Sequence, residues 1–306
     1  MKYLITGAAG FIGSHLFKKL IDEKKNVIGI DNFSHASKNP ITTEVQYADI
    51  RYYNDVEPLV EWADVVYHLA AQIHVDKSIL NPQETIDVNV TGTLNVLEAV
   101  RKHHKKMVFA SSSEVYGTSQ TGAMSEDHPL DAQSPYAAAK VAGDRLCKSY
   151  VDTYGTQVAI LRNFNAFGEY QNDSSYGGVI AIFTRRALSN QPLEIYGDGN
   201  QQRDYMHVRD AIRGYELLSE QEYWGKPVNI GTGETVSINE LAEAIVRISG
   251  SKSEIVHVKP RSGEVMKLCA DITKAKQLGF VPSTDLEKDL TTYIQFYANT
   301  ILKNVH

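Results

Sequence analysis

The sequence predicts an α/β fold in which a doubly wound parallel sheet is accompanied by a smaller C-terminal lobe. Short apolar runs rich in β-branched residues alternate with longer amphipathic stretches through the first half of the chain. The runs show almost no polar alternation, which is typical of parallel strands that helices cover on both faces.

The elements of this sheet follow one another in the first half of the chain. Strands are predicted at residues 3–6, 26–31, 65–69, 106–111 and 158–162, and helices at residues 13–24, 84–103 and 136–154. After about residue 165, loops with Gly, Pro and Asn interrupt shorter elements. We therefore assign residues 1–165 to the sheet domain, with about residues 207–236 as a segment that could rejoin it, and residues 166–306 to the second lobe. Such a lobe would close a cleft over the carboxyl ends of the strands, where open α/β sheets bind ligands.

The composition argues against a nucleic-acid or membrane partner. The formal net charge is -6 and the chain has no Lys/Arg-dense run, whereas phosphate backbones require a basic surface. The apolar start at residues 3–5 is too short for a signal peptide, and no later stretch could span a bilayer. We expect a cytoplasmic enzyme. Cys147 and Cys269 lack CxxC or Cys/His spacing, so we predict neither a disulfide framework nor a metal site.

A glycine-rich turn joins the first predicted strand to the first helix. Gly7 permits the tight turn, Gly10 lets a pyrophosphate approach the backbone, and Gly13 allows close helix–strand packing. Asp31 ends the next strand, where a carboxylate accepts hydrogen bonds from the adenosine ribose and repels a 2′-phosphate. The segment therefore predicts a Rossmann domain that binds NAD rather than NADP.

Tyr136 and Lys140 are four residues apart in a predicted helix that Pro135 can begin, so both side chains lie on one helix face. An ammonium there, together with a positive nicotinamide ring, should lower the pKa of the phenol so that it can accept a proton from a sugar hydroxyl. Such a spacing alone is more often a solvated face. The preceding strand favours the catalytic interpretation, because it brings Ser112 and Glu114 to the carboxyl edge of the sheet.

The motifs together resemble the extended short-chain dehydrogenase/reductase family of nucleotide-sugar epimerases and dehydratases, over essentially the whole chain. The resemblance rests on GAAGFIG at 7–13, HLAA at 68–71, NVTGT at 89–93, SSSEVYG at 111–117, YAAAK at 136–140, RNFN at 162–165, QRDY at 202–205 and NIG at 229–231. It implies that Ser112 acts with Tyr136 and Lys140 at the C4 oxygen of the sugar, and that NAD stays bound and is regenerated in each turnover. It also implies a homodimer that pairs the helices at 84–103 and 136–154.

The resemblance extends to the binding residues. The expected cofactor-binding set is Gly7, Gly10, Phe11, Ile12, Gly13, Asp31, Asn32, Asp49, Ile50, Leu69, Ala70, Ala71, Tyr136 and Lys140. Asn165, Arg203 and Arg261 match positions that hold the substrate diphosphate, and Ser113 and Val179 complete the expected substrate-binding set.

Glu114 favours a 4,6-dehydratase, since a base at this place in the motif can remove the C5 proton once C4 is a ketone. Water would then leave from C6, and NADH would return hydride there. Ser113 stands where some dehydratases have an aspartic acid, and residues 176–183 look more like a 4-epimerase, which is the alternative. A uronic acid decarboxylase is third, with Arg185 or Arg186 for the sugar carboxylate. A catalytically silent NAD-binding regulator is disfavoured, because it would not need Ser112, Tyr136 and Lys140.

Overall fold

The computed structural model describes residues 1–120, 122–174, 177–260 and 264–302, and its centre is a seven-stranded parallel sheet. The strand order is β11-β6-β5-β4-β1-β2-β3, and every adjacent pair is parallel. The strands are β1 (Lys2–Thr6), β2 (Asn26–Asp31), β3 (Gln46–Tyr47), β4 (Val65–His68), β5 (Lys106–Ser112), β6 (Gln157–Asn163) and β11 (Pro227–Ile230). The predicted α/β fold class is confirmed.

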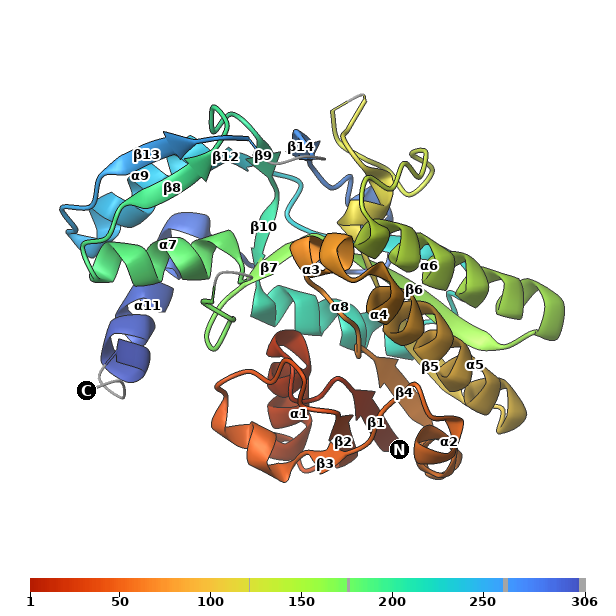
Figure 1. Ribbon diagram of the computed structural model, residues 1–306. Coiled ribbons are helices and arrows are strands. Elements are labelled where there is room, and N and C mark those ends of the chain that lie inside the picture. Colours follow the sequence, from red (N-terminus) through yellow and green to blue (C-terminus); the bar gives the residue numbers. More distant parts are fainter. Residues whose placement is uncertain (121, 175–176, 261–263, 303–306) are drawn as a thin grey trace.

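Helices cover both faces of the sheet (Figure 1). On one face α1 (Phe11–Asp22) packs against α8 (Val208–Glu220), and on the other α5 (Thr93–Lys102) packs between α2 (Tyr53–Trp62) and α6 (Pro135–Tyr154). Each face has its own apolar core, one centred on residues such as Leu16 and Tyr215, the other on residues such as Leu97 and Phe109. A sheet buried on both faces explains why its strands read as nearly continuous apolar runs.

The predicted helix at 84–103 is three elements. They are α4 (Pro82–Ile86), a π-helical turn η2 (Asp87–Gly92) and α5. Gly92 lies in the π-helical turn, and a Cβ there would stand 2.6 Å from the Ile50 side chain, so this turn packs closely on the loop after β3. The other short elements of this half are η1 (Pro40–Glu44), α3 (Val75–Leu80) and η3 (Ser113–Tyr116).

The remaining elements form a lobe at the carboxyl ends of the strands (Figure 1). Its core lies between α7 (Val179–Leu188), α9 (Ile238–Ser249) and α11 (Leu286–Phe296). Three small sheets pair β10 (Tyr205–His207) with β7 (Asn165–Phe167), β12 (Val236–Ser237) and β14 (Lys267–Leu268) with β9 (Gln202–Arg203), and β13 (Ile255–Val258) with β8 (Leu193–Tyr196). α10 (Thr273–Gln277) and η4 (Tyr297–Leu302) complete the described chain.

The chain crosses between the two parts more than once. After β10 it returns to the sheet as α8 and then as β11, which pairs with β6 so that Ile230 lies opposite Asn163. α8 packs on α1. Residues 208–230 therefore belong to the same layers as the first half of the chain. No helix within the described residues is both long enough and apolar enough to span a membrane.

Candidate active site

A cleft of about 440 Å³ runs along the carboxyl ends of β1, β2, β4, β5 and β6, which is a volume typical of small-molecule sites. It brings together most residues predicted for the site: Gly7, Gly10, Phe11, Ile12, Gly13, Asp31, Asn32, Ile50, Leu69, Ala70, Ala71, Ser112, Ser113, Glu114, Tyr136, Lys140 and Asn165. Of the described residues predicted for it, Asp49, Val179 and Arg203 do not line the cleft. Arg261 lies outside the described residues.

The glycine turn leaves room for a ligand because it lacks side chains. Gly7 has a φ of +76°, and a Cβ on it would stand 2.6 Å from the Ala70 backbone nitrogen. A Cβ on Gly13 would stand 2.0 Å from the Gly7 carbonyl oxygen, so helix α1 meets β1 closely. Gly10 is the N-cap of α1 and has no side chain to cap the first amides. These amides and the positive end of the helix are suited to a pyrophosphate.

Asp31 stands at the end of β2 beside this turn. Its carboxylate accepts hydrogen bonds from the Ala9 amide at 3.0 Å and from the Phe33 amide at 2.8 Å, which fix its orientation. Burial raises the pKa of Asp31, while these amides oppose the change. An oriented carboxylate next to a helix N-terminus that accepts a pyrophosphate is the donor and acceptor set that the adenosine half of NAD requires.

Asp49 does not line the cleft but holds a residue that does. It accepts hydrogen bonds from Arg51 at 2.6 Å and from the Asn32 amide group at 3.0 Å. Burial would raise the pKa of Asp49, but the hydrogen bonds from Arg51 and Asn32 outweigh it and lower that pKa to about 2. Asp49 therefore orients the side chain of Asn32, which does line the cleft.

Tyr136 and Lys140 lie in the first two turns of α6, near the end of β5. The helix begins after Ser134, whose hydroxyl accepts a hydrogen bond from the Ala137 amide at 3.1 Å. The Tyr136 amide donates to the Ser78 hydroxyl at 3.1 Å, which joins α6 to α3. Lys140 Nζ donates to the Ala110 carbonyl of β5 at 2.8 Å. Both side chains are thus buried and held against the strand that ends in Ser112.

The lowered pKa of Tyr136 was predicted for a site that also holds a positive nicotinamide ring, and it stays a prediction. Burial raises the pKa of Tyr136 to about 12, and the hydrogen bond with Ser112 only partly opposes this. Burial also lowers the pKa of Lys140 to about 8. Desolvation is thus the largest cause of the pKa change in both groups.

Glu114 lies in η3, directly after β5. The Ser112 hydroxyl caps this turn by accepting a hydrogen bond from the Glu114 amide at 3.2 Å. Burial raises the pKa of Glu114, the Arg203 guanidinium lowers it, and Glu264 raises it again. The cleft therefore contains a desolvated carboxyl group close to Tyr136.

The cations expected at the sugar end are engaged by other groups. Arg203 donates to Glu264 at 2.8 Å, and Arg185 donates to the Asp173 carbonyl at 3.0 Å. Arg186 pairs with Glu194 at 3.0 Å. Neither Arg185 nor Arg186 is among the described residues that line the cleft, which gives the decarboxylase interpretation little support.

Several residues that the sequence did not identify as site residues contribute to the cleft. Asn163 and Tyr215 both line it, and the Asn163 amide donates to the Tyr215 hydroxyl at 3.3 Å. Asn163 lies beside Ser112 in the register of β5 and β6, within the RNFN motif, so the motif itself was a usable signal. Tyr215 lies within α8, where the local pattern gives no such indication.

A buried ion pair connects the elements around β5. Arg162 is 1% exposed and donates to both oxygens of Asp144, at 2.9 and 3.1 Å, from β6 to α6. It also donates to the Tyr116 hydroxyl at 2.9 Å, and the Ser111 hydroxyl donates to Asp144 at 3.0 Å. These bonds connect α6, β5, β6 and η3, the elements that position Tyr136 and Glu114.

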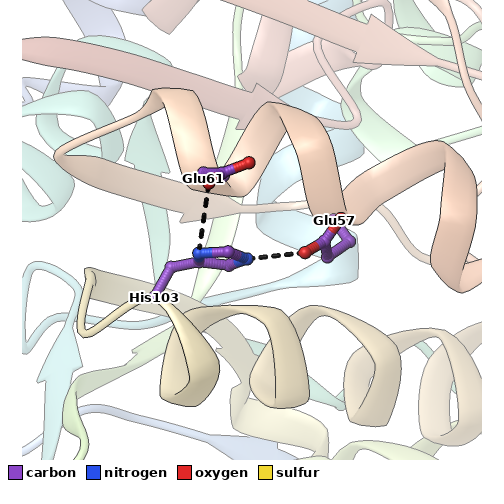
Figure 2. A group of neighbouring side chains, drawn as sticks. All are labelled: Glu57, Glu61 and His103. Carbon is purple, nitrogen blue, oxygen red and sulfur yellow. Dashed lines mark hydrogen bonds and ion pairs between the residues drawn. The ribbon is translucent and has the colours of Figure 1, made fainter.

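A group of side chains outside the cleft resembles a metal site in composition (Figure 2). His103, at the end of α5, contacts Glu57 through Nε2 at 2.7 Å and Glu61 through Nδ1 at 3.9 Å. Lys102 occupies the same Glu57 oxygen at 2.7 Å. Because the two ring nitrogens face different carboxylates and an ammonium is already present, the group is a network of polar contacts between two helices. Its three residues are not among those described as lining the cleft.

A Rossmann sheet, a glycine turn and a Ser–Tyr–Lys set in one cleft define a dinucleotide-dependent oxidoreductase-type enzyme. Residues 4–292 match the family described as GDP-mannose 4,6 dehydratase. The chain is also 41% identical over 302 residues to a protein named putative UDP-glucose 4-epimerase from Methanocaldococcus jannaschii, covering 97% of this chain and 98% of the relative. It therefore belongs to this family, the extended short-chain dehydrogenases/reductases, which comprises NAD-dependent nucleotide-sugar epimerases, dehydratases and decarboxylases.

Solved structures of such enzymes share the fold. A UDP-glucose 4-epimerase from Thermotoga maritima, solved with UDP-glucose, superposes with a TM-score of 0.94 at 33% identity, covering 98% of this chain and 100% of that one. A dTDP-glucose 4,6-dehydratase from Streptomyces venezuelae, solved with NAD, gives a TM-score of 0.92 at 29% identity over 98% of both chains. Enzymes of both activities are thus similar to this chain along its whole length.

Proposed function

We propose that the protein is an NAD-dependent nucleotide-sugar 4-epimerase. The observation that carries the proposal is the position of Tyr136 and Lys140 in the same cleft as the glycine turn and Asp31. The choice of epimerase over the dehydratase that the sequence favoured rests on the relatives named as UDP-glucose 4-epimerases, which match over their whole length at 41% and 33% identity.

The residues of this chain would divide the work in the following way. Tyr136 removes the proton from the C4 hydroxyl, and the Ser112 hydroxyl donates a hydrogen bond to the same oxygen. NAD supplies the hydride acceptor and a positive ring charge when it is bound. Lys140, fixed by the Ala110 carbonyl, adds a second positive charge that favours the phenolate. The 4-keto sugar would then turn within the cleft, accept the same hydride at C4 on its other face, and take the proton back from Tyr136 at the C4 oxygen.

Substrate binding is proposed on the carboxyl side of β6. Asn165 lines the cleft and donates to the Asp204 carbonyl at 3.3 Å, which fixes its amide. Arg203 is available to a diphosphate if the substrate displaces Glu264. We propose that Ser113, Val179 and Arg261 complete this end, as the resemblance to the family implies.

A 4,6-dehydratase is the second candidate, and the buried Glu114 favours it. Burial raises the pKa of Glu114, which suits a group that takes a proton from C5 and returns it to a leaving hydroxyl. Ser113 still stands where an acidic partner would help. The two candidates share the first step at C4 and then diverge: the dehydratase deprotonates C5 and loses water, whereas the epimerase turns the sugar and leaves C5 unchanged.

The discriminating experiment is incubation with UDP-glucose, UDP-N-acetylglucosamine and dTDP-glucose, followed by mass spectrometry and NMR. Unchanged mass with inverted C4 supports the epimerase, whereas loss of one water supports the dehydratase. No change with any of these substrates would contradict both, and retention of NAD without turnover would then support the regulator.

The Glu114→Gln variant sharpens this experiment. In an epimerase, the substitution should change turnover less than about tenfold, because Glu114 takes no proton. In a dehydratase it should lower turnover by about a hundredfold or more, the usual contribution of a general base. Deuterium incorporation at C5 from heavy water, present only in the dehydratase, is the independent readout.

A homodimer is proposed along α4, η2, α5 and α6. Five large apolar side chains of this region and the neighbouring α3 are exposed in the single chain: Ile79, Leu80, Ile86, Leu94 and Tyr154. Pairing two copies would remove them from water. Light scattering should give twice the chain mass, and Leu94→Glu should shift it toward the mass of one chain. A monomeric unmodified protein would contradict the proposal.

A further inference from the structure

Two loops approach each other across the rim of the cofactor cleft. Ser37 lines the cleft on the side of the sheet domain, and Asn172 lines it on the side of the lobe. The next residue of each loop takes part in an ion pair, since Lys38 Nζ donates to Asp173 at 3.2 Å. The contact therefore joins the two walls of the cleft at one point.

The Lys38 side of this contact is anchored to the glycine turn. The Ser37 amide donates to the Ala9 carbonyl at 2.7 Å, and the Ser37 hydroxyl lies 3.3 Å from that of Ser14 in α1. Asn39 is 3% exposed and its side chain accepts from the Ile41 amide at 3.2 Å. Lys38 thus projects from a segment fixed on both sides against the residues that would hold a pyrophosphate.

The Asp173 side is anchored to the lobe. Asp173 is 8% exposed, and the Tyr297 hydroxyl donates to its carboxylate. Arg185 of α7 donates to its backbone carbonyl at 3.0 Å. Burial would raise the pKa of Asp173, but the Tyr297 hydroxyl and the Lys38 ammonium outweigh it and lower that pKa, so the group carries its charge at neutral pH.

The same loop contacts α1 at a second place. Figure 1 shows the connection between β7 and α7 extending toward α1. His15 of α1 lies 2.8 Å from the Glu169 carbonyl through Nε2, and the Glu169 carboxylate pairs with His207 at 3.4 Å. Residues 169 and 173 therefore meet the sheet domain on either side of Asn172, which lines the cleft.

We propose that the ion pair of Lys38 and Asp173 is a latch across the cofactor cleft that slows the release of NAD. The inference rests on the NAD binding in the proposed function, and it adds residues that position the lobe over the bound dinucleotide. An enzyme that regenerates its cofactor in each turnover gains from slow release. Lys38 and Asp173 are positioning residues, because they act through the loops that carry Ser37 and Asn172.

The test measures NAD release from protein that was loaded with NAD. The loaded protein is diluted into excess NADH, which fills each site as NAD leaves. The rise in fluorescence of bound NADH therefore gives the rate of NAD release. Lys38→Met should accelerate release about threefold to fivefold, which is the range for an ion pair with one exposed partner. Asp173→Asn, which keeps an oxygen for the Tyr297 hydroxyl, should accelerate it by a similar factor or more.

A double variant and a matched control show whether Lys38 and Asp173 act together. If the two residues form one latch, Lys38→Met with Asp173→Asn should release NAD no faster than the faster single variant. Multiplying effects would mean that Lys38 contacts the cofactor by itself, and the latch would be rejected. Lys18→Met removes another ion pair of the sheet domain, with Asp22, and should leave release unchanged.

The outcomes also separate this inference from the proposed function. Release rates of the variants equal to that of the unmodified protein, with NAD bound, would overturn the latch and leave the epimerase proposal standing. Failure of the unmodified protein to retain NAD at all would overturn both. Equal thermal unfolding of the NAD-free variants checks that faster release does not come from a loosened fold.

Discussion

The two ends of the cleft are built by different means. The cofactor end is formed mainly by backbone, because Gly7, Gly10 and Gly13 leave space by lacking side chains. At the proposed sugar end, charged side chains from distant segments meet near Glu114, as when Arg203 pairs with Glu264. Gly7 and Gly13 therefore leave no room for a Cβ atom, whereas the second end depends on individual charges that single substitutions can change.

The largest expected effect comes from a substitution that should remove turnover and leave NAD binding unchanged. Tyr136→Phe should lower turnover by roughly a thousandfold or more, since it removes the group that takes the C4 proton. NAD affinity, measured by calorimetry, should stay within about threefold because the glycine turn is untouched. Normal turnover in this variant would sink the catalytic assignment.

A backbone substitution should damage the cofactor end instead. Gly7→Ala places a Cβ 2.6 Å from the Ala70 nitrogen at a φ of +76°. We expect a loss of about 2–3 kcal/mol in unfolding free energy and of at least tenfold in NAD affinity. Gly155→Ala is the matched control, since Gly155 has a φ of +66° with open space around its Cβ, so it should show only the smaller conformational cost and normal NAD binding.

Charge changes at the sugar end should alter substrate binding alone. Arg203→Met should raise the KM for the nucleotide-sugar about tenfold, the usual order for a lost charged hydrogen bond. Glu264→Gln should lower it severalfold by freeing the guanidinium. Steady-state kinetics at saturating NAD provides the comparison. If the KM of both variants equals that of the unmodified protein, the ion pair has no part in substrate binding.

The smallest expected effect is a pH dependence of stability from Lys140. Its pKa is lowered from 10.5 to about 8 in the folded protein, so the unfolded chain binds its proton more tightly. Stability should therefore rise with pH between about 8 and 10.5 because of this group. Lys140→Met should lack that part of the increase in urea unfolding curves at pH 8 and 10. Parallel curves would contradict the lowered pKa.

The sequence predicted the parts of the molecule that depend on local patterns. The apolar runs identified five of the seven strands, and the contiguous glycine turn identified the cofactor wall. It did not identify β3, which has two residues, or β11, which pairs with a strand far earlier in the chain. Such pairings are set by tertiary contacts that no local window contains.

The charges and ion-pair partners of the site residues were harder to predict than which residues line the cleft. Tyr136 and Lys140 were placed correctly in one cleft, but their spacing could not reveal that Lys140 points to the Ala110 carbonyl. Arg203 pairs with Glu264, which lies 61 positions later in the chain. Desolvation and ion pairing depend on burial, which a residue pattern indicates only for continuous apolar runs.

The place of β11 at the end of the sheet has a consequence for fragments of this protein. A product that stops before Pro227 would leave β6 without its outer neighbour, and its unpaired amide and carbonyl groups would face water as an open edge. Such a fragment should self-associate through strand addition. Supplying the missing C-terminal piece in trans should suppress that aggregation, which would make split versions of the chain usable as a complementation assay.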